Sequence, residues 1–225
     1  MKTPSCILAL LIVFGVVACP AADVSELTKE TQKSVNENKK FTLVWWIPTE
    51  FWSLALKDDK NITDAQRTDF FTALDKYTIV VVVTGDFGPM AAFQAKSRTD
   101  IIQNSELRVN DKVLPVLAAA DISQSAVNFI AMMKPLMANM LGNFVQGMEF
   151  LLYSNEQKGA KMLAATKPGG LTYTIYGKTF AWHLPLGSLL PPEIDPATKE
   201  QFPGNYLFNP YTGSKLTPLK AVPDA

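Results

Sequence analysis

Histidine and cysteine are nearly absent from this sequence. Among 225 residues there is one histidine, His183, and there are two cysteines, Cys6 and Cys19, both near the N-terminus. A zinc site or a Ser-His-Asp triad needs partners that such a chain does not supply. Any Ser-His or Cys-His mechanism would have to use His183, and no Gly-x-Ser-x-Gly motif presents a nucleophile. A surface histidine that forms hydrogen bonds is therefore favoured over a catalytic one.

An excess of either charge is also missing. The 21 basic residues balance the 21 acidic residues, so composition gives no electrostatic reason to expect a nucleic-acid partner. Acidic clusters typical of Ca²⁺ or Mg²⁺ sites are absent, as is a phosphate-binding Gly-Lys loop. The sequence indicates no cofactor.

A hydrophobic run long enough to span a membrane is lacking too. Lys2 precedes an apolar block, Cys6–Val17, which ends in small residues around Ala18. About a dozen apolar residues is short of the roughly 20 that a spanning helix needs. Residues 1–18 have the layout of a secretory signal peptide. Such peptides have a basic N-terminal region, a short apolar run and small residues at the cleavage site.

The end of this segment, Val16-Val17-Ala18-Cys19, resembles a bacterial lipobox. The resemblance implies that Cys19 is lipidated as the first residue of the mature chain, and that a lipid anchor tethers the protein to a membrane of the cell envelope. Cys19 would then be the only cysteine kept, which excludes an internal disulfide. A lone thiol is a liability in an oxidising compartment, and lipidation would occupy it. The alternatives are cleavage after Ala21 or Ala22, which gives a soluble secreted or periplasmic protein, and an uncleaved signal anchor.

The mature chain divides into three parts by composition. Residues 19–40 are mostly polar and are expected to form a tether or a loosely docked helix. Residues 41–184 are expected to form a single domain. Eight of the fifteen prolines fall in residues 185–225, which predicts an extended C-terminal tail.

Local patterns within residues 41–184 predict helices and hairpins without a βαβαβ rhythm. Thr63 and Gln66 form a capping box for a helix ending near Lys76, and Tyr77–Thr84 predicts a strand buried on both faces. The other predicted elements are a strand at 41–47, hairpins at 105–117 (turning at Asn110-Asp111) and 171–184 (turning at Gly177-Lys178), and a helix at 122–141 capped by Asp121. The expected class is α+β, with a mainly antiparallel sheet and helices on one side. A β-sandwich with inserted helices is the alternative.

Two carboxylates and three tryptophans are candidates for a site. Glu50 follows the first strand, and Asp86 lies in a glycine turn; paired acids could hydrolyse a glycosidic bond. Each also has a structural explanation. Glu50 is an acidic residue in the first turn of a helix, where the helix dipole favours it, and Asp86 is a residue type that forms chain turns. Trp45, Trp46 and Trp52 indicate either a core seed, which is favoured, or an aromatic groove for a sugar or a peptide.

Methionines are concentrated in the 122–141 helix, where Met133, Met137 and Met140 share one face. Soft thioethers select Cu(I), but the same spacing buries a core stripe, and this second interpretation is favoured.

The sequence thus predicts an exported lipoprotein with a binding or envelope-accessory role and no catalysis, whose partner besides the membrane is an envelope protein or a small ligand. A small envelope hydrolase using Glu50 and Asp86, or a copper-binding envelope protein, remains the alternative.

Overall fold

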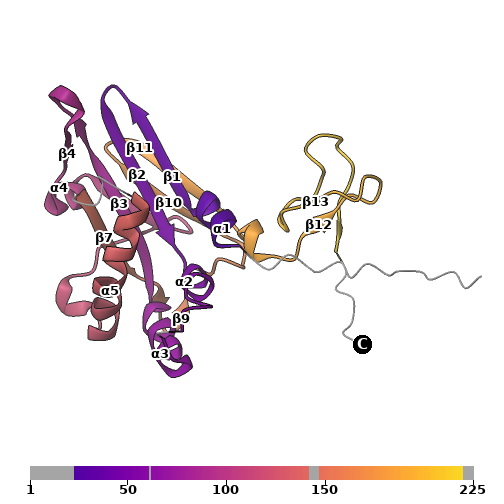
Figure 1. Ribbon diagram of the computed structural model, residues 1–225, viewed down its shortest axis with the longest axis horizontal. Coiled ribbons are helices and arrows are strands. Elements are labelled where there is room, and N and C mark those ends of the chain that lie inside the picture. The colour runs from indigo at the N-terminus through magenta and orange to yellow at the C-terminus, as the bar shows by residue number, and fades with distance from the viewer. Residues whose placement is uncertain (1–22, 61, 142–146, 220–225) are drawn as a thin grey trace, which may run out of the picture.

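The fold was analysed in a computed structural model, which describes residues 23–60, 62–141 and 147–219. The described residues form an α+β fold in which every strand pair is antiparallel. This confirms the predicted class. Figure 1 shows a body of sheets and helices, with a smaller C-terminal part standing to one side of it.

The larger sheet is built around one strand that is apolar throughout. It contains β1 (Gln32–Glu37), β2 (Lys40–Ile47), β3 (Tyr77–Phe87), β4 (Phe93–Ala95) and β7 (Met148–Ser154). The order is β1-β2-β3, and the far edge of β3 pairs first with β7 and then with β4. Val80–Val83 are fully buried, which confirms the predicted strand covered on both faces.

Helices cover one face of this sheet. They are α2 (Thr49–Ala55), α3 (Asp64–Leu74) and α5 (Gln124–Leu141). Trp45 of β2 meets the ring of Phe51 edge-on, and Trp52 of α2 meets Phe129 of α5 with ring centroids 5.0 Å apart. The predicted capping box of Thr63 and Gln66 is present at the start of α3.

A second sheet covers the opposite face. Its order is β11-β10-β5-β6, from β5 (Ser105–Val109), β6 (Lys112–Leu114), β10 (Gly169–Ile175) and β11 (Lys178–Leu184). Because neighbouring residues of a strand point to opposite faces, Trp46 faces away from Trp45 and meets Trp182 of β11 at 6.4 Å. The body therefore has three layers, helices, sheet and sheet, with apolar side chains at both interfaces.

The remaining elements are short. They are α4 (Arg98–Gln103), β8 (Glu156–Gln157), β9 (Ala160–Lys161), and the 3₁₀ turns η1 (Pro89–Ala91), η2 (Ala119–Asp121) and η4 (Gly187–Leu189). Gly85, predicted in a turn, lies within β3 opposite Ala95 of β4. A Cβ on Gly85 would lie 2.3 Å from the Gln94 carbonyl oxygen, so only glycine lets β4 approach β3.

For residues 23–40, the structure corrects the expectation that residues 19–40 form a polar tether or a loosely docked helix. Residues 24–37 form α1 (Val24–Thr31) and the edge strand β1, which pairs with β2 along its whole length. Leu27 is fully buried, and Thr31 accepts a hydrogen bond from the Trp45 indole at its hydroxyl and from the Trp182 indole at its carbonyl. Two buried residues and a complete strand pairing are enough to order a segment whose sequence is mostly polar.

The C-terminal region also departs from its prediction. Residues 191–219 do not form an extended tail. They form a lobe around a three-stranded sheet of β12 (Glu193–Ile194), β13 (Gln201–Phe202) and β14 (Thr217–Pro218), in the order β13-β12-β14. We call residues 191–219 the C-terminal lobe; Figure 1 shows it beside the body, beyond α1.

Two local predictions need smaller corrections. The cap of α5 is Ser123, whose hydroxyl accepts from the amide of Ala126, because the chain first makes the turn η2 ending at the predicted cap, Asp121. The second hairpin turns at Tyr176-Gly177, one residue before the prediction, and both have positive φ. The first hairpin turns at Asn110-Asp111, both with positive φ, as predicted.

Candidate functional site

A hollow lies between α1 and the C-terminal lobe. We call it the α1–lobe cleft; its volume is about 730 Å³. One wall comes from α1 and the residue before it, and the other comes from η4 and the segment around β13. The lining residues are Asp23, Glu26, Lys29, Glu30, Gly187, Ser188, Leu190, Pro192, Gln201, Phe202, Pro203, Gly204, Asn205 and Tyr206.

Glu30 joins the two walls of the cleft. Its carboxylate accepts hydrogen bonds from the Gly187 amide at 2.7 Å, from the Ser188 amide at 3.0 Å and from the Ser188 hydroxyl at 2.6 Å. The Gly187 amide is thus one of the donors that hold α1 against η4, and the lobe follows η4 directly. A carboxylate occupied in this way is a structural group, so it is not free to bind a ligand.

The rest of the lining combines acidic and apolar groups. Lys29 pairs with Glu26 at 2.6 Å, and Asp23 accepts from the Ser25 amide as the cap of α1. Opposite them, Tyr206 stacks on Phe202 with ring centroids 6.4 Å apart. The cleft therefore offers carboxylates along one wall and aromatic and proline surface along the other.

A second hollow of about 390 Å³ opens where the two sheets of the body separate, beside Asp86. We call it the open-end pocket. Glu37, Lys40 and Asp86 lie opposite one another on β1, β2 and β3, and the deepest hydroxyls, Thr42 and Thr84, hydrogen bond to each other at 2.8 Å.

Each carboxylate of the open-end pocket is paired with a lysine. Asp86 contacts Lys96 and Glu37 contacts Lys178, both at 2.6 Å. The hydrogen bond from Lys96 lowers the pKa of Asp86, whereas a catalytic acid in glycoside hydrolysis needs a raised pKa. The pocket is thus lined by two ion pairs, with Lys40 beside them.

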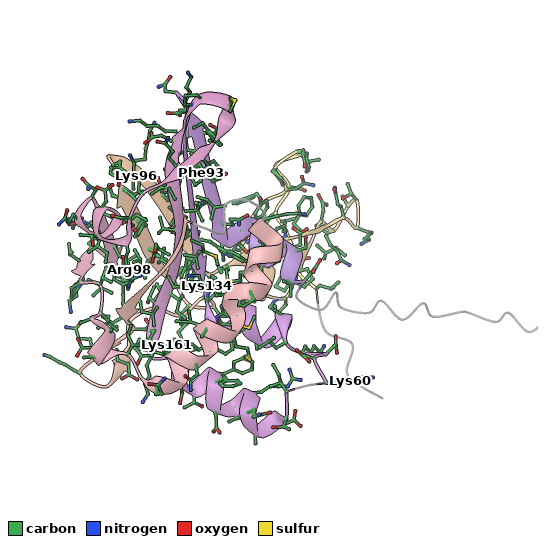
Figure 2. The ribbon with its side chains drawn as sticks, turned by 60° about the vertical axis from the view of Figure 1, so that its left-hand side comes forward. Lys60, Phe93, Lys96, Arg98, Lys134 and Lys161 are labelled. Atoms are coloured by element: carbon green, nitrogen blue, oxygen red, sulfur yellow. The ribbon has the colours of Figure 1, made fainter. Side chains whose placement is uncertain are left out.

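The structure does not bring Glu50 and Asp86 together. Glu50 follows the end of β2 that pairs with Ile79 of β3. Asp86 lies seven residues along β3 from Ile79, which at the rise of a strand is about 23 Å from that end. Figure 2 shows the separation through their neighbours: Lys96, which pairs with Asp86, is high in the view, and Lys161, which shares a recess with Glu50, is low. That recess has a volume of about 10 Å³, which is room for about one water molecule.

The other predicted candidates are either buried or isolated. Trp45, Trp46 and Trp52 are at most 3% exposed, so they belong to the core and line no open groove. Met133 and Met137 are 5% and 1% exposed and also pack in the core; the side chain of Met140 lies outside the described residues. His183 is exposed on β11 opposite Gly170. Cys19 also lies outside the described residues.

Three buried hydroxyl groups form a polar cluster between the two sheets. Within the described ranges, those of Ser105, Tyr153 and Tyr173 have no hydrogen-bond partner of good geometry. Burial raises the pKa of Tyr153 and raises the pKa of Tyr173 to about 12. Because both side chains are buried, these phenols are uncharged groups of the interior and are closed to a ligand.

Sequence reasoning found Asp86 in the open-end pocket but missed its other lining residues and all those of the α1–lobe cleft. The walls of the α1–lobe cleft come from segments predicted as a tether and a tail, so no contact between them was expected. The one available signal was Glu26 and Lys29 at helical spacing, with Leu27 between them.

Comparison of the chain with protein-family models, with curated proteins and with solved structures finds no match in any of the three. In the described part of the chain, no helix is long and apolar enough to cross a membrane. Across residues 23–219, apart from the undescribed positions, no three His, Cys, Asp or Glu side chains are grouped so as to hold a metal ion.

Proposed function

We propose that this protein is an exported lipoprotein, anchored to an envelope membrane through Cys19, whose domain binds a ligand in the α1–lobe cleft without catalysis. The observation that carries the binding role is the cleft itself. Its volume of about 730 Å³ lies within the range of about 300–1,000 Å³ typical of ligand sites. The signal segment and Cys19 support the anchor.

The lining of the cleft favours a particular class of ligand. Glu26 and Lys29 neutralise each other, and Glu30 is occupied by η4, so Asp23 is the remaining acidic group. The apolar wall, with Phe202 and Tyr206, suits a flat or ring-shaped apolar face. The proposed ligand is therefore uncharged or cationic, such as a sugar chain or a proline-containing basic peptide.

Binding is tested by NMR chemical-shift mapping of the mature chain with neutral oligosaccharides and with short basic, proline-containing peptides. We expect the shifted amides to lie in α1 and residues 201–206. Tyr206→Ala should raise the Kd about tenfold or more, the loss typical of an aromatic anchor. Tyr176→Ala is the matched control, because Tyr176 and Tyr206 are both 42% exposed and Tyr176 lies in the body.

Shifts clustered elsewhere, or no shift with either ligand class, would overturn the binding role. The anchor is tested separately by mass spectrometry of the mature N-terminus from cells. We expect an N-terminal peptide that begins with lipid-modified Cys19. A chain beginning after Ala21 or Ala22 would remove the anchor and leave the cleft unaffected.

A further inference from the structure

The C-terminal lobe exposes four large apolar side chains close together in sequence. Tyr206, Leu207, Phe208 and Tyr211 are 42%, 74%, 56% and 82% exposed; we call them the aromatic patch. Exposed large apolar side chains gathered on one short segment are a feature of interaction sites. Moreover, no charged residue occurs from Phe202 to Ser214, so this surface can leave water without desolvating a charge.

A buried carboxylate holds the segment that carries the patch. Asp195, 1% exposed, accepts hydrogen bonds from the Asn209 side-chain amide at 2.6 Å and from the Ser214 hydroxyl at 2.5 Å. Asn209 in turn accepts from the amide of Tyr211 at 2.9 Å. The apolar side chains are therefore presented by a fixed turn, which lowers the entropy lost when they bind a surface.

The patch lies close to the start of the described chain. Asp23 and Tyr206 line the same cleft, and Cys19 precedes Asp23 by four residues. A chain reaches at most about 3.5 Å per residue, so a lipid on Cys19 would keep α1 within about 14 Å of the membrane. The tether predicted from composition would have been several times longer. With so short a link, the lobe cannot be far from the lipid headgroups.

We propose that the aromatic patch docks in the headgroup region of the membrane that carries the anchor, an inference that rests on the proposed lipidation of Cys19. Tyrosine and other aromatic rings favour this interface because they combine an apolar body with a polar edge. Exposed Lys215 follows the uncharged segment and can approach lipid phosphates. Docking fixes the orientation of the domain and places the opening of the cleft beside the membrane.

The test places a tryptophan in the patch and measures its contact with lipid. The full mature chain is coupled through its single thiol, Cys19, to a maleimide lipid in vesicles of phosphatidylglycerol and bromine-labelled phosphatidylcholine. Bromine quenches tryptophan on contact, and the four native tryptophans are at most 3% exposed. In Phe208→Trp we expect most of the added fluorescence to be lost. In the control, Val113→Trp, 44% exposed in the native chain on β6, we expect none to be lost.

A second measurement removes the apolar surface. Sedimentation with the same vesicles, using the mature chain with its thiol capped and no lipid attached, should show about tenfold weaker binding for Leu207→Ser combined with Phe208→Ser, because apolar burial is lost. Val113→Ser should change nothing. Neither Leu207 nor Phe208 lines the cleft, so ligand binding should persist in the double variant.

Quenching at neither site, or equal quenching at both, would overturn the docking proposal. So would a photocrosslinker at position 208 that captures a protein in cells while Phe208→Trp stays unquenched, because the patch would then be a protein contact. Chemical coupling supplies the anchor regardless of processing in the cell. Failure of docking is therefore distinguishable from failure of lipidation, which mass spectrometry reports.

Discussion

The body and the C-terminal lobe are stabilised in different ways. The body buries a continuous apolar core on both faces of its larger sheet, including Trp45, Trp52 and Val80–Val83. The lobe has two buried apolar residues, Phe202 and Leu216, beside the buried polar pair Asp195 and Asn209. Apolar side chains fold the body, whereas the lobe is organised by hydrogen bonds and leaves most of its aromatic surface exposed. This contrast supports the proposal that the body is a scaffold for an interaction surface on the lobe.

The largest loss of stability in the body is expected from a large-to-small substitution in its core. Trp52 is 1% exposed and contacts Phe51 and Phe129, so Trp52→Ala should lower the free energy of unfolding by about 3–5 kcal/mol. Urea denaturation followed by circular dichroism measures the change. Met132→Ala, at a 40% exposed position of α5, is the control, with an expected change within about 0.5 kcal/mol. Equal effects would mean that the packing of Trp52 contributes no more to stability than an exposed side chain does.

The lobe should fail locally when its carboxylate is removed. In Asp195→Ala the donors from Asn209 and Ser214 lose their acceptor, so hydrogen exchange should become faster in residues 195–218 and stay unchanged in β3. Glu200→Ala, an exposed carboxylate of the same lobe, serves as the control and should leave exchange unchanged. Faster exchange throughout β3 would show that the lobe and the body unfold as one unit.

Acid should reproduce this local effect. Hydrogen bonds from Ser214 and Asn209 hold the pKa of Asp195 below its usual value. The stabilisation is therefore complete above the unfolded pKa of about 3.9 and is lost as the pH falls through the lower folded pKa. The protection factors of the lobe amides should fall below about pH 4 in the wild type, whereas Asp195→Ala should lack this dependence.

The smallest effect on stability is expected from removing the ion pair that links the two sheets. Lys178 and Glu37 pair at 2.6 Å but are both more than half exposed. Exposed ion pairs contribute about 0.2–1 kcal/mol, so Lys178→Met should lower the free energy of unfolding by less than about 1 kcal/mol. A double-mutant cycle with Glu37→Gln isolates the pair. A coupling as large as the effect of Trp52→Ala would mean that charge, and not apolar packing, joins the sheets.

Local sequence rules predicted much of the body. The capping box at Thr63, the positive-φ turn at Asn110-Asp111 and the buried strand after Tyr77 each depend on a few adjacent residues, and all three are present. The cap of α5 was misplaced because Asp121 and Ser123 both satisfy the local rule, and η2 decides between them.

The candidate site could not be predicted in the same way. Glu50 follows one end of the pairing between β2 and β3, and Asp86 lies at its other end, opposite Lys40, which sets the two carboxylates apart. The α1–lobe cleft brings together residues about 160 to 180 positions apart in the chain, through contacts such as Glu30 with Ser188. No pattern within a short window contains that information, because closing so long a loop depends on contacts elsewhere.

By itself the sequence determined the local elements, the α+β class and the expectation of export, because turns, caps, apolar runs and signal segments are encoded in neighbouring residues. Only the tertiary structure decided that α1 and β1 belong to the domain, that the proline-rich segment folds into a lobe, and that the two enclose a cleft. The physical reason is that polar segments such as Gln32–Glu37 gain their stability from pairing with a distant edge and from a few buried anchors such as Leu27 and Thr31. Such contacts leave no periodic trace in the sequence.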